Sequence, residues 1–209
     1  MSIVLRMCSV AALGLAAVAS ANAAKTAEAN PDAAAMQLAA RVCSNCHGPG
    51  GNSVSPLFPK LAAQQETYLV AQIEAFKAKR TRGEPEAHEY MHGMAALIDT
   101  ATVDALARYY ARQKAPPGQG GDPALIAKGQ QLFQQGAPER QIVPCASCHG
   151  ASAGGNGAIP RLAGQHAEYI THQIKAIQAR LRDSPVMYGI VQKLEPEDIK
   201  AVAVYLQSL

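Results

Sequence analysis

Two short motifs of cysteine and histidine have the residue types and spacing of a specific chemistry. They are Cys43-Ser44-Asn45-Cys46-His47 and Cys145-Ala146-Ser147-Cys148-His149. In the pattern C-x-x-C-H, two thiols can each add to one vinyl group of a haem, and the histidine that follows is held beneath the iron as an axial ligand. The sequence therefore predicts two covalently bound haem c groups.

Three other chemistries use paired cysteines. Four cysteines in an exported chain can form two disulfides, and two C-x-x-C pairs can bind one zinc ion, but neither site needs a histidine directly after both pairs. A thiol redox motif more usually lies in an alternating pattern of strands and helices, which this sequence lacks. The fifth cysteine, Cys8, lies in the N-terminal segment that we expect to be removed, so no mature cysteine is left over.

The first 23 residues have the pattern of a secretory signal peptide. Arg6 supplies a positive charge, an apolar run extends from Val10 to Val18, and small residues precede the expected cleavage site after Ala23. The apolar run is too short for a good transmembrane span, although an uncleaved anchor is the alternative. We expect the mature protein in a bacterial periplasm.

The composition limits both the partners and the core. The formal net charge is +3 and the chain has no long run of Lys or Arg, so nucleic acid is not an expected partner. Hydrophobic residues make up 48% of the chain, which is too many for a disordered protein. Aromatic residues make up only 5% and Trp is absent. Two small domains would therefore have little bulky apolar material, and we expect another group to complete their cores.

An internal repeat relates the two halves of the chain. Residues 58–62, Phe-Pro-Lys-Leu-Ala, match residues 159–163, Ile-Pro-Arg-Leu-Ala. Further along, the segment Met91-His92-Gly93 matches Met187-Tyr188-Gly189. One structural unit with one C-x-x-C-H motif is therefore present twice.

The spacing of apolar residues predicts an all-α fold of two tandem domains. Short helices are expected to lead to each motif, over Ala33–Arg41 and Pro123–Gln135, and the last helices are expected over Thr102–Arg112 and Pro196–Ser208. A cluster of Pro, Gly and small residues marks a linker. The expected divisions are a signal peptide over 1–23, an N-terminal domain over 24–113, a linker over 114–123 and a C-terminal domain over 124–209.

A sixth ligand for each iron should lie downstream of the motif and occur in both repeats. Met91 and Met187 meet these conditions, and we expect both in a loop before the last helix. Thioether sulfur is an established haem ligand, and His/Met ligation raises the reduction potential. Met94 is a competitor, but its counterpart is Ile190. The histidines without a matched histidine in the other repeat are expected to be surface or structural residues: His88, His92, His166 and His172.

Two matched prolines are candidates to orient the axial imidazoles. Pro59 and Pro160 follow His47 and His149 at nearly equal spacing. A carbonyl that accepts a hydrogen bond from the free imidazole N–H would fix the ring and tune its basicity. The next residues, Lys60 and Arg161, are matched cations that could approach haem propionates, with solvated surface charge as the alternative.

The last helices also match, with Ala107-Arg108-Tyr109 in the first repeat and Ala203-Val204-Tyr205 in the second. Together the motifs, the proline segments, the Met-x-Gly segments and these Ala-x-Tyr segments resemble the dihaem cytochrome c4 family. The resemblance implies two tandem class I cytochrome c domains facing each other across a pseudo-twofold interface. It also implies axial roles for His47 with Met91 and His149 with Met187, and an orienting role for Pro59 and Pro160. One departure is that Ala35 and Ala39 stand where many class I domains have glycine and an aromatic residue.

The resemblance implies a periplasmic electron carrier, in some members associated with the inner membrane. The expected partners are a respiratory donor and a terminal oxidase. Two six-coordinate irons leave no position for a substrate, so we expect no catalytic residues and no enzyme activity. We also expect a monomer. The alternatives are the dihaem subunit of a flavoprotein dehydrogenase, or a dihaem redox enzyme such as a thiosulfate dehydrogenase.

Overall fold

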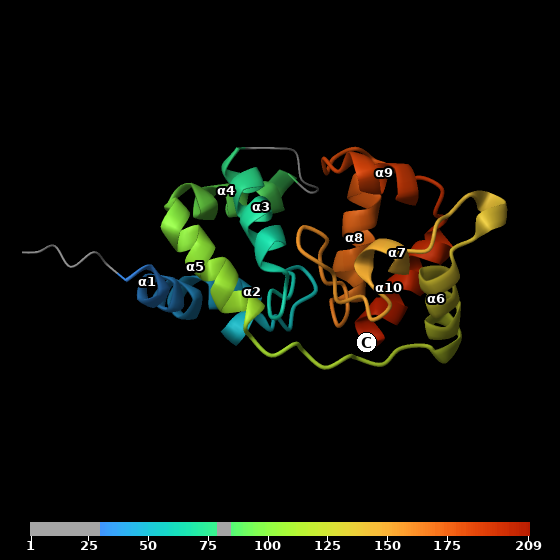
Figure 1. The fold of residues 1–209 in the computed structure, drawn as a ribbon, viewed down its shortest axis with the longest axis horizontal. Coiled ribbons are helices and arrows are strands. Elements are labelled where there is room, and N and C mark those ends of the chain that lie inside the picture. Colours follow the sequence, from blue (N-terminus) through green and yellow to red (C-terminus); the bar gives the residue numbers. More distant parts are fainter. Residues whose placement is uncertain (1–29, 79–84) are drawn as a thin grey trace, which may run out of the picture.

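The computed structural model describes residues 30–78 and 85–209, without the side chains of residues 85–88. The expected signal peptide, residues 1–23, lies outside the described residues. Within the described part of the chain the regular elements are helices (Figure 1), and β-structure is limited to two isolated bridges, Ala137 with Ile142 and Asn156 with Ile159. The prediction of an all-α fold is confirmed. No described helix is long and apolar enough to cross a membrane.

The helices follow the same order in both halves, as the repeat predicts. The N-terminal half contains α1 (Pro31–Leu38), a π-helical turn (Ala39–Cys43), α2 (Ser44–His47), a 3-10 turn (Pro49–Gly51), α3 (Glu66–Lys77), α4 (Pro85–Ala96) and α5 (Thr100–Ala111). The C-terminal half contains α6 (Pro123–Gln135), a 3-10 turn (Pro138–Arg140), α7 (Ala146–His149), α8 (Ala167–Gln178), α9 (Pro185–Val191) and α10 (Pro196–Ser208). The segment between α5 and α6 runs without helix along one edge of the molecule (Figure 1).

Acidic and polar residues start the helices where the sequence places them. The side chain of Asp99 accepts a hydrogen bond from Thr102 N at the start of α5, and Asp122 caps α6 in the same way. Pro196 occupies the first turn of α10, where its missing N–H has no cost. These caps explain why α6 and α10 have the bounds expected from the sequence.

One expected helix ends earlier than the sequence predicts, and α8 ends in a sharp turn. The expected Ala33–Arg41 helix changes after Leu38 into the π-helical turn that leads to the first motif. The chain turns back after α8, where Arg180 takes a positive φ of 57°. The backbone amides of Leu181 and Arg182 then both donate to Ala176 O, so Leu181 lies outside the helix and is exposed.

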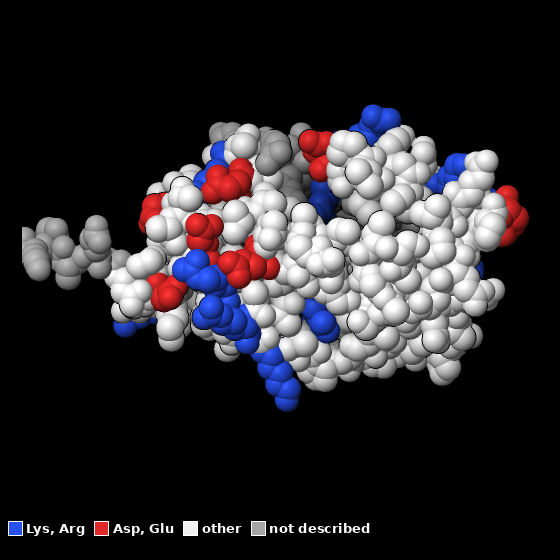
Figure 2. Space-filling model, viewed as in Figure 1, with Lys and Arg blue, Asp and Glu red and all other residues white. Residues whose placement is uncertain are grey.

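Charged side chains are distributed unevenly over the face shown in Figure 2. Acidic and basic residues lie side by side over the N-terminal half, whereas the C-terminal half presents mostly uncharged side chains on this face. One of the pairs in the N-terminal half joins Arg108 on α5 to Asp32 on α1, with 2.8 Å between Nη2 and Oδ1. Electrostatic recognition must therefore use local patches, because the net charge is small.

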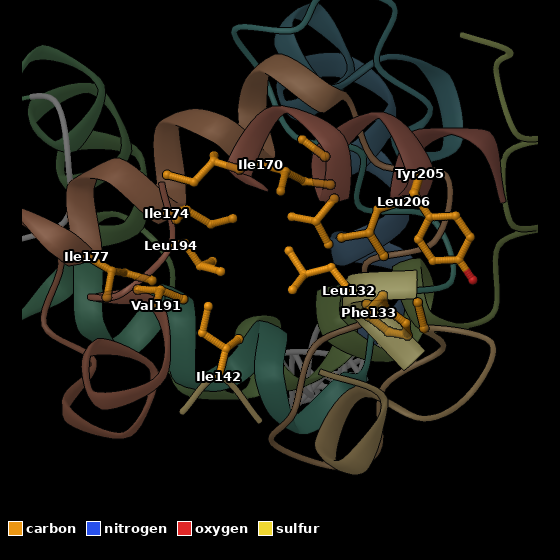
Figure 3. Packing of buried hydrophobic residues seen from close by; sticks show 14 of the residues in the cluster. Leu132, Phe133, Ile142, Ile170, Ile174, Ile177, Val191, Leu194, Tyr205 and Leu206 are labelled. Carbon is orange, nitrogen blue, oxygen red and sulfur yellow. The ribbon is translucent and has the colours of Figure 1, made fainter. Parts of the chain in front are cut away.

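The core of the C-terminal half is built where α6 crosses α10. A Cβ added to Gly129 would lie 2.1 Å from Ala201 O, so only glycine permits this close approach. Phe133 then packs against Tyr205, with 5.6 Å between ring centroids. In Figure 3 the apolar side chains of α6, α8 and α10 face one another with Ile142 and Val191 at one side.

The core of the N-terminal half contains smaller side chains. Its buried cluster among the described residues consists largely of alanines, with Leu69, Leu106 and Tyr110 as the larger members. Ala35 and Ala39, where the sequence departs from the family pattern, are both buried in this cluster. The small side chains of this cluster reflect the shortage of bulky apolar residues in the sequence.

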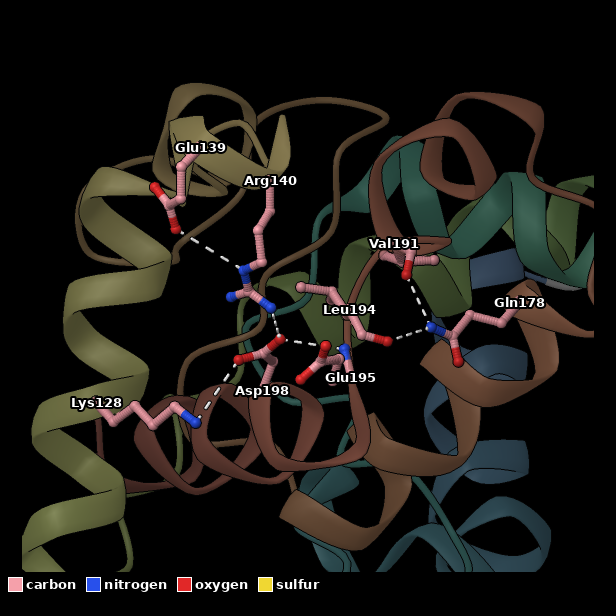
Figure 4. Close-up of polar contacts among 8 residues, drawn as sticks. All are labelled: Lys128, Glu139, Arg140, Gln178, Val191, Leu194, Glu195 and Asp198. Carbon is pink, nitrogen blue, oxygen red and sulfur yellow. Dashed lines mark hydrogen bonds and ion pairs between the residues drawn. The ribbon is translucent and has the colours of Figure 1, made fainter.

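A buried carboxylate anchors the start of α10 (Figure 4). Asp198 Oδ2 accepts hydrogen bonds from Arg140 Nη1 at 2.6 Å and from Glu195 N at 3.1 Å. Lys128 Nζ lies 3.7 Å from the other carboxylate oxygen. Burial alone would raise the pKa of Asp198, but the hydrogen bonds and the two cations lower this pKa below its usual value.

Removing this charge is expected to weaken folding only where the carboxylate is ionised. Asp198→Asn should lower the free energy of unfolding by about 2 kcal/mol at pH 7, because charge-assisted hydrogen bonds are lost. A carboxyl group whose pKa is lowered by folding contributes stability above its unfolded value of about 3.9 and loses it as the pH falls. The difference between variant and native protein should therefore shrink by pH 3, in urea titrations followed by circular dichroism.

The matched control is Glu197→Gln, which removes an exposed carboxylate from the same turn of α10. It should change the free energy of unfolding by only a few tenths of a kcal/mol, roughly the value of an exposed charge near a helix N-terminus. An Asp198→Asn deficit that stays constant between pH 7 and pH 3 would contradict the role assigned to this carboxylate.

Candidate functional site

Each C-x-x-C-H motif lies on a single turn of helix, α2 or α7. Cys43 immediately precedes α2 and His47 ends it, and Cys145 and His149 take the same places at α7. Residues three and four positions apart share one face of a helix, so each turn presents two thiols and one imidazole to the same side. The second cysteine of each motif is exposed, whereas His47 and His149 are only 8% and 5% exposed.

Both imidazoles are held by the carbonyl of the matched proline. His47 Nδ1 lies 2.9 Å from Pro59 O, and His149 Nδ1 lies 3.0 Å from Pro160 O. Because a carbonyl oxygen only accepts, Nδ1 must carry the proton and Nε2 keeps a free lone pair. Burial lowers the pKa of both imidazoles, although the hydrogen bond to the carbonyl opposes this effect. A neutral imidazole with a fixed Nδ1–H is the form that binds a metal.

The first thiol of each motif does not have the properties of a redox nucleophile. Burial raises the pKa of the Cys43 thiol, and it raises the pKa of Cys145 to about 11. Reactive thiols in redox motifs have lowered pKa values instead. No disulfide joins any of the four described cysteines, and the described residues contain no cluster of three or more His, Cys, Asp or Glu side chains that could hold a metal ion. The zinc alternative therefore has no site among the described residues.

Unpartnered buried polar atoms test whether a haem fits this chain. Among the described side chains, Arg161 Nε and Asn52 Oδ1 are buried without a hydrogen-bond partner. Burial lowers the pKa of Arg161, and an anion beside it would offset that cost. A haem supplies carboxylates for such a cation, vinyl groups for the thiols and iron for the free Nε2. The residues present therefore fit the group.

Lys60 and Arg161 lie at the contact between the two halves. Lys60 is buried, and its Nζ donates to Gly164 O at 2.7 Å. Arg161 is half-buried and both residues line the same small cavity between the halves. Lys60 and Arg161 are therefore not solvated surface charges, which was the alternative for these two cations.

The two candidate axial methionines lie in helices. Met91 is on α4 and Met187 on α9, so the expectation that both stand in a loop was wrong. A proline begins each helix, and neither Gly93 nor Gly189 takes the positive φ that a turn would favour, so both glycines continue the helix. Both methionines are half-buried, and Met187 packs against the C-terminal core.

The remaining described histidines form hydrogen bonds to backbone carbonyls or lie at the surface. His92 Nδ1 lies 2.9 Å from Phe76 O, and His172 is exposed. His166 is buried, and its Nε2 lies 3.0 Å from Ser53 O in the other half. The side chain of His88 lies outside the described residues.

Sequence reasoning missed two glutamines that join the halves. Gln64 and Gln165 each hydrogen-bond to the backbone of the other half. The signal was present, because both follow the matched Leu-Ala segments of the repeat. It could not be interpreted without knowing which segments of the two halves face each other.

Known proteins share both the sequence and the fold. The family model described as Cytochrome c matches residues 33–112 and 126–209. Cytochrome c4 from Azotobacter vinelandii is 39% identical over 193 residues, which are 88% of this chain and 91% of the relative. The crystal structure of reduced recombinant cytochrome c4 from Pseudomonas stutzeri is similar with a TM-score of 0.77 at 36% identity, covering 85% of this chain and 98% of that one. A thiosulfate dehydrogenase electron acceptor from Stutzerimonas stutzeri is 32% identical over 178 residues, or 82% of this chain and 80% of the relative.

Proposed function

The chain belongs to the cytochrome c family and, within it, to the two-domain cytochrome c4 proteins, and we propose that it passes electrons from a respiratory donor to a terminal oxidase or a similar acceptor. Its two domains carry two covalently attached haem c groups, so the protein is a dihaem electron carrier. Haem iron supplies one-electron chemistry by alternating between ferric and ferrous states. The observation that carries the proposal is the matched pair of buried imidazoles, each bonded to a proline carbonyl.

We propose that the residues of the two sites act as matched sets. Cys43 and Cys46 form the thioether links of the N-terminal domain, and Cys145 and Cys148 those of the C-terminal domain. His47 and His149 are the nitrogen ligands, kept neutral and oriented by Pro59 O and Pro160 O. Met91 and Met187 supply the sulfur ligands, which favour the ferrous state and raise the potential.

This ligand set leaves no coordination position for a substrate, and we propose that the protein is not an enzyme and has no catalytic residues. Electrons then enter and leave where a domain comes close to a partner. In the N-terminal domain the loop after α2 exposes Val54 and Leu57, which are 94% and 75% accessible to solvent. Such side chains can make a small, dry and short-lived contact, which suits electron transfer.

The place and organisation of the protein are part of the same proposal. A signal peptide of residues 1–23 directs the chain to the periplasm, where it works as a monomer with or without peripheral association with the inner membrane. The domains extend over 24–113 and 124–209, joined by a linker over 114–123.

A second class of protein is a candidate electron donor. The relative from Stutzerimonas stutzeri is named for accepting electrons from thiosulfate dehydrogenase. We propose that an enzyme of this class is one donor, which makes this chain its acceptor rather than the dehydrogenase itself. A role as the dihaem subunit of a flavoprotein dehydrogenase is the alternative.

Removing one proposed sulfur ligand should affect one haem. Met91→Ala and Met187→Ala should each abolish about half of the weak optical band that arises from charge transfer between methionine sulfur and ferric iron, because one of two His/Met sites is lost. Met94→Ala is the control, since Met94 lies on α4 with Met91 but is exposed. An intact band in the Met91 or Met187 variant would refute that ligand.

The carrier and enzyme interpretations differ in what thiosulfate does alone. The oxidised holoprotein should be low-spin and should stay oxidised when thiosulfate is added, because both irons are fully coordinated. Adding a thiosulfate dehydrogenase should then reduce it, as measured by the haem absorbance. Reduction by thiosulfate without the dehydrogenase, or a high-spin spectrum of the resting protein, would support the enzyme interpretation instead.

A further inference from the structure

Each half of the molecule extends one glutamine to a backbone segment of the other half. Gln165 Oε1 accepts from Lys60 N at 3.0 Å, and Gln165 Nε2 donates to Lys60 O at 3.0 Å. In the opposite direction, Gln64 Oε1 accepts from Arg161 N at 2.7 Å, and Gln64 Nε2 donates to Arg161 O at 2.9 Å. Since an amide N–H only donates and a carbonyl only accepts, these pairs fix the orientation of both side-chain amides.

The backbone amides that the glutamines bind belong to the peptide groups that hold the axial histidines. Lys60 N–H is part of the same peptide group as Pro59 C=O, which accepts from His47 Nδ1 at 2.9 Å. A continuous hydrogen-bonded chain therefore runs from His47, through one peptide group, to Gln165 of the other half. The second chain runs from His149, through the Pro160–Arg161 peptide group, to Gln64.

Both glutamines are buried and held in place. Gln64 and Gln165 are each only 7% exposed, so water does not readily replace their hydrogen bonds. Each Oε1 also accepts from the amide of the next residue, Gln65 N at 2.9 Å and His166 N at 3.0 Å. Those next residues reach across the contact as well, because Gln65 Nε2 donates to Gly154 O and His166 Nε2 lies against Ser53 O.

Hydrogen bonds in such a chain strengthen one another. A peptide group that donates its N–H to a buried acceptor is polarised, and its carbonyl oxygen becomes a stronger acceptor. A stronger acceptor at Nδ1–H makes the imidazole a more basic ligand. Ferric iron carries one more positive charge than ferrous iron, so a more basic ligand favours the ferric state.

We propose that the reduction potential of each haem is lowered by a glutamine of the other domain: Gln165 acts on the N-terminal haem through Lys60 and Pro59, and Gln64 acts on the C-terminal haem through Arg161 and Pro160. The inference rests on the proposed axial roles of His47 and His149. Both glutamines are positioning residues, because neither touches the haem ligands directly. The potentials therefore depend on the docking of the two domains.

The test is whether substituting the glutamine of one domain changes the reduction potential of the haem in the other domain. Gln165→Met keeps the length of the side chain but cannot accept the Lys60 N–H. At a fixed solution potential, the ratio of ferrous to ferric N-terminal haem should rise about threefold, which is about 30 mV for a one-electron couple. The C-terminal haem, in the domain that carries the substitution, should change far less. Gln64→Met should give the reverse. Redox titrations of the holoprotein followed by NMR, with resonances assigned to each domain, measure both potentials.

A second readout and a matched control separate this effect from loosened docking. The His47 Nδ1–H resonance of the reduced protein should move upfield in Gln165→Met, as expected for a weaker hydrogen bond. Tyr68→Phe removes another hydrogen bond across the same contact, from Arg182 Nη2 to Tyr68 Oη at 2.7 Å, which joins no proline peptide group. It should leave both potentials unchanged.

Failure of this inference can be told apart from failure of the proposed carrier function. If the variants keep the low-spin His/Met spectrum but both haems shift equally, or only the haem of the substituted domain shifts, the crossed inference is wrong and the carrier function stands. Loss of His/Met ligation in the unsubstituted protein would instead contradict the proposed function. If Gln165→Met does not fold, Gln165→Glu is the second variant, because it retains the hydrogen-bond acceptor and adds a negative charge. The ratio of ferrous to ferric N-terminal haem should then fall. A rise in this ratio would overturn the inference.

Discussion

The hydrogen bond between a buried imidazole and a proline carbonyl is the constraint on which both sites depend. A histidine can bind iron only when it is neutral and when the correct nitrogen faces the metal. Burial removes the positive charge, and the carbonyl holds the remaining proton on Nδ1. The helical turn of the motif, the loop that returns to Pro59 or Pro160 and the core beneath it all serve to hold these two groups within hydrogen-bond distance.

The loop that supplies this carbonyl also forms the contact between the domains. After Pro59 the chain turns at Ala63, which has a positive φ of 57° and donates to Tyr110 O at the end of α5. Gly164, with a φ of 74°, makes the corresponding bond to Leu206 O of α10. Each loop is thereby fixed to its own last helix while its side chains cross to the other half. Ligand support and domain docking are therefore properties of one segment.

Local patterns in the sequence predicted the parts of the fold that depend on neighbouring residues. The bounds of α6 and α10 follow from Asp122, Pro196 and the apolar spacing, and the proline carbonyls follow from matched spacing in the repeat. The helical placement of Met91 and Met187 was missed because the Met-x-Gly segments suggested a loop. Gln64 and Gln165 were missed for a different reason: their partners are about half a chain away, and no periodicity encodes which surfaces of two domains meet.

The reciprocal contacts make the docking surface self-complementary. Where one half places Gln64 against Arg161, the other places Gln165 against Lys60, and Gln65 and His166 follow the same exchange. A surface of this kind would close a symmetric dimer from two identical copies. The covalent connection between α5 and α6 turns that association into an intramolecular one. Pairing of the two redox centres consequently does not depend on how much of the protein a cell makes.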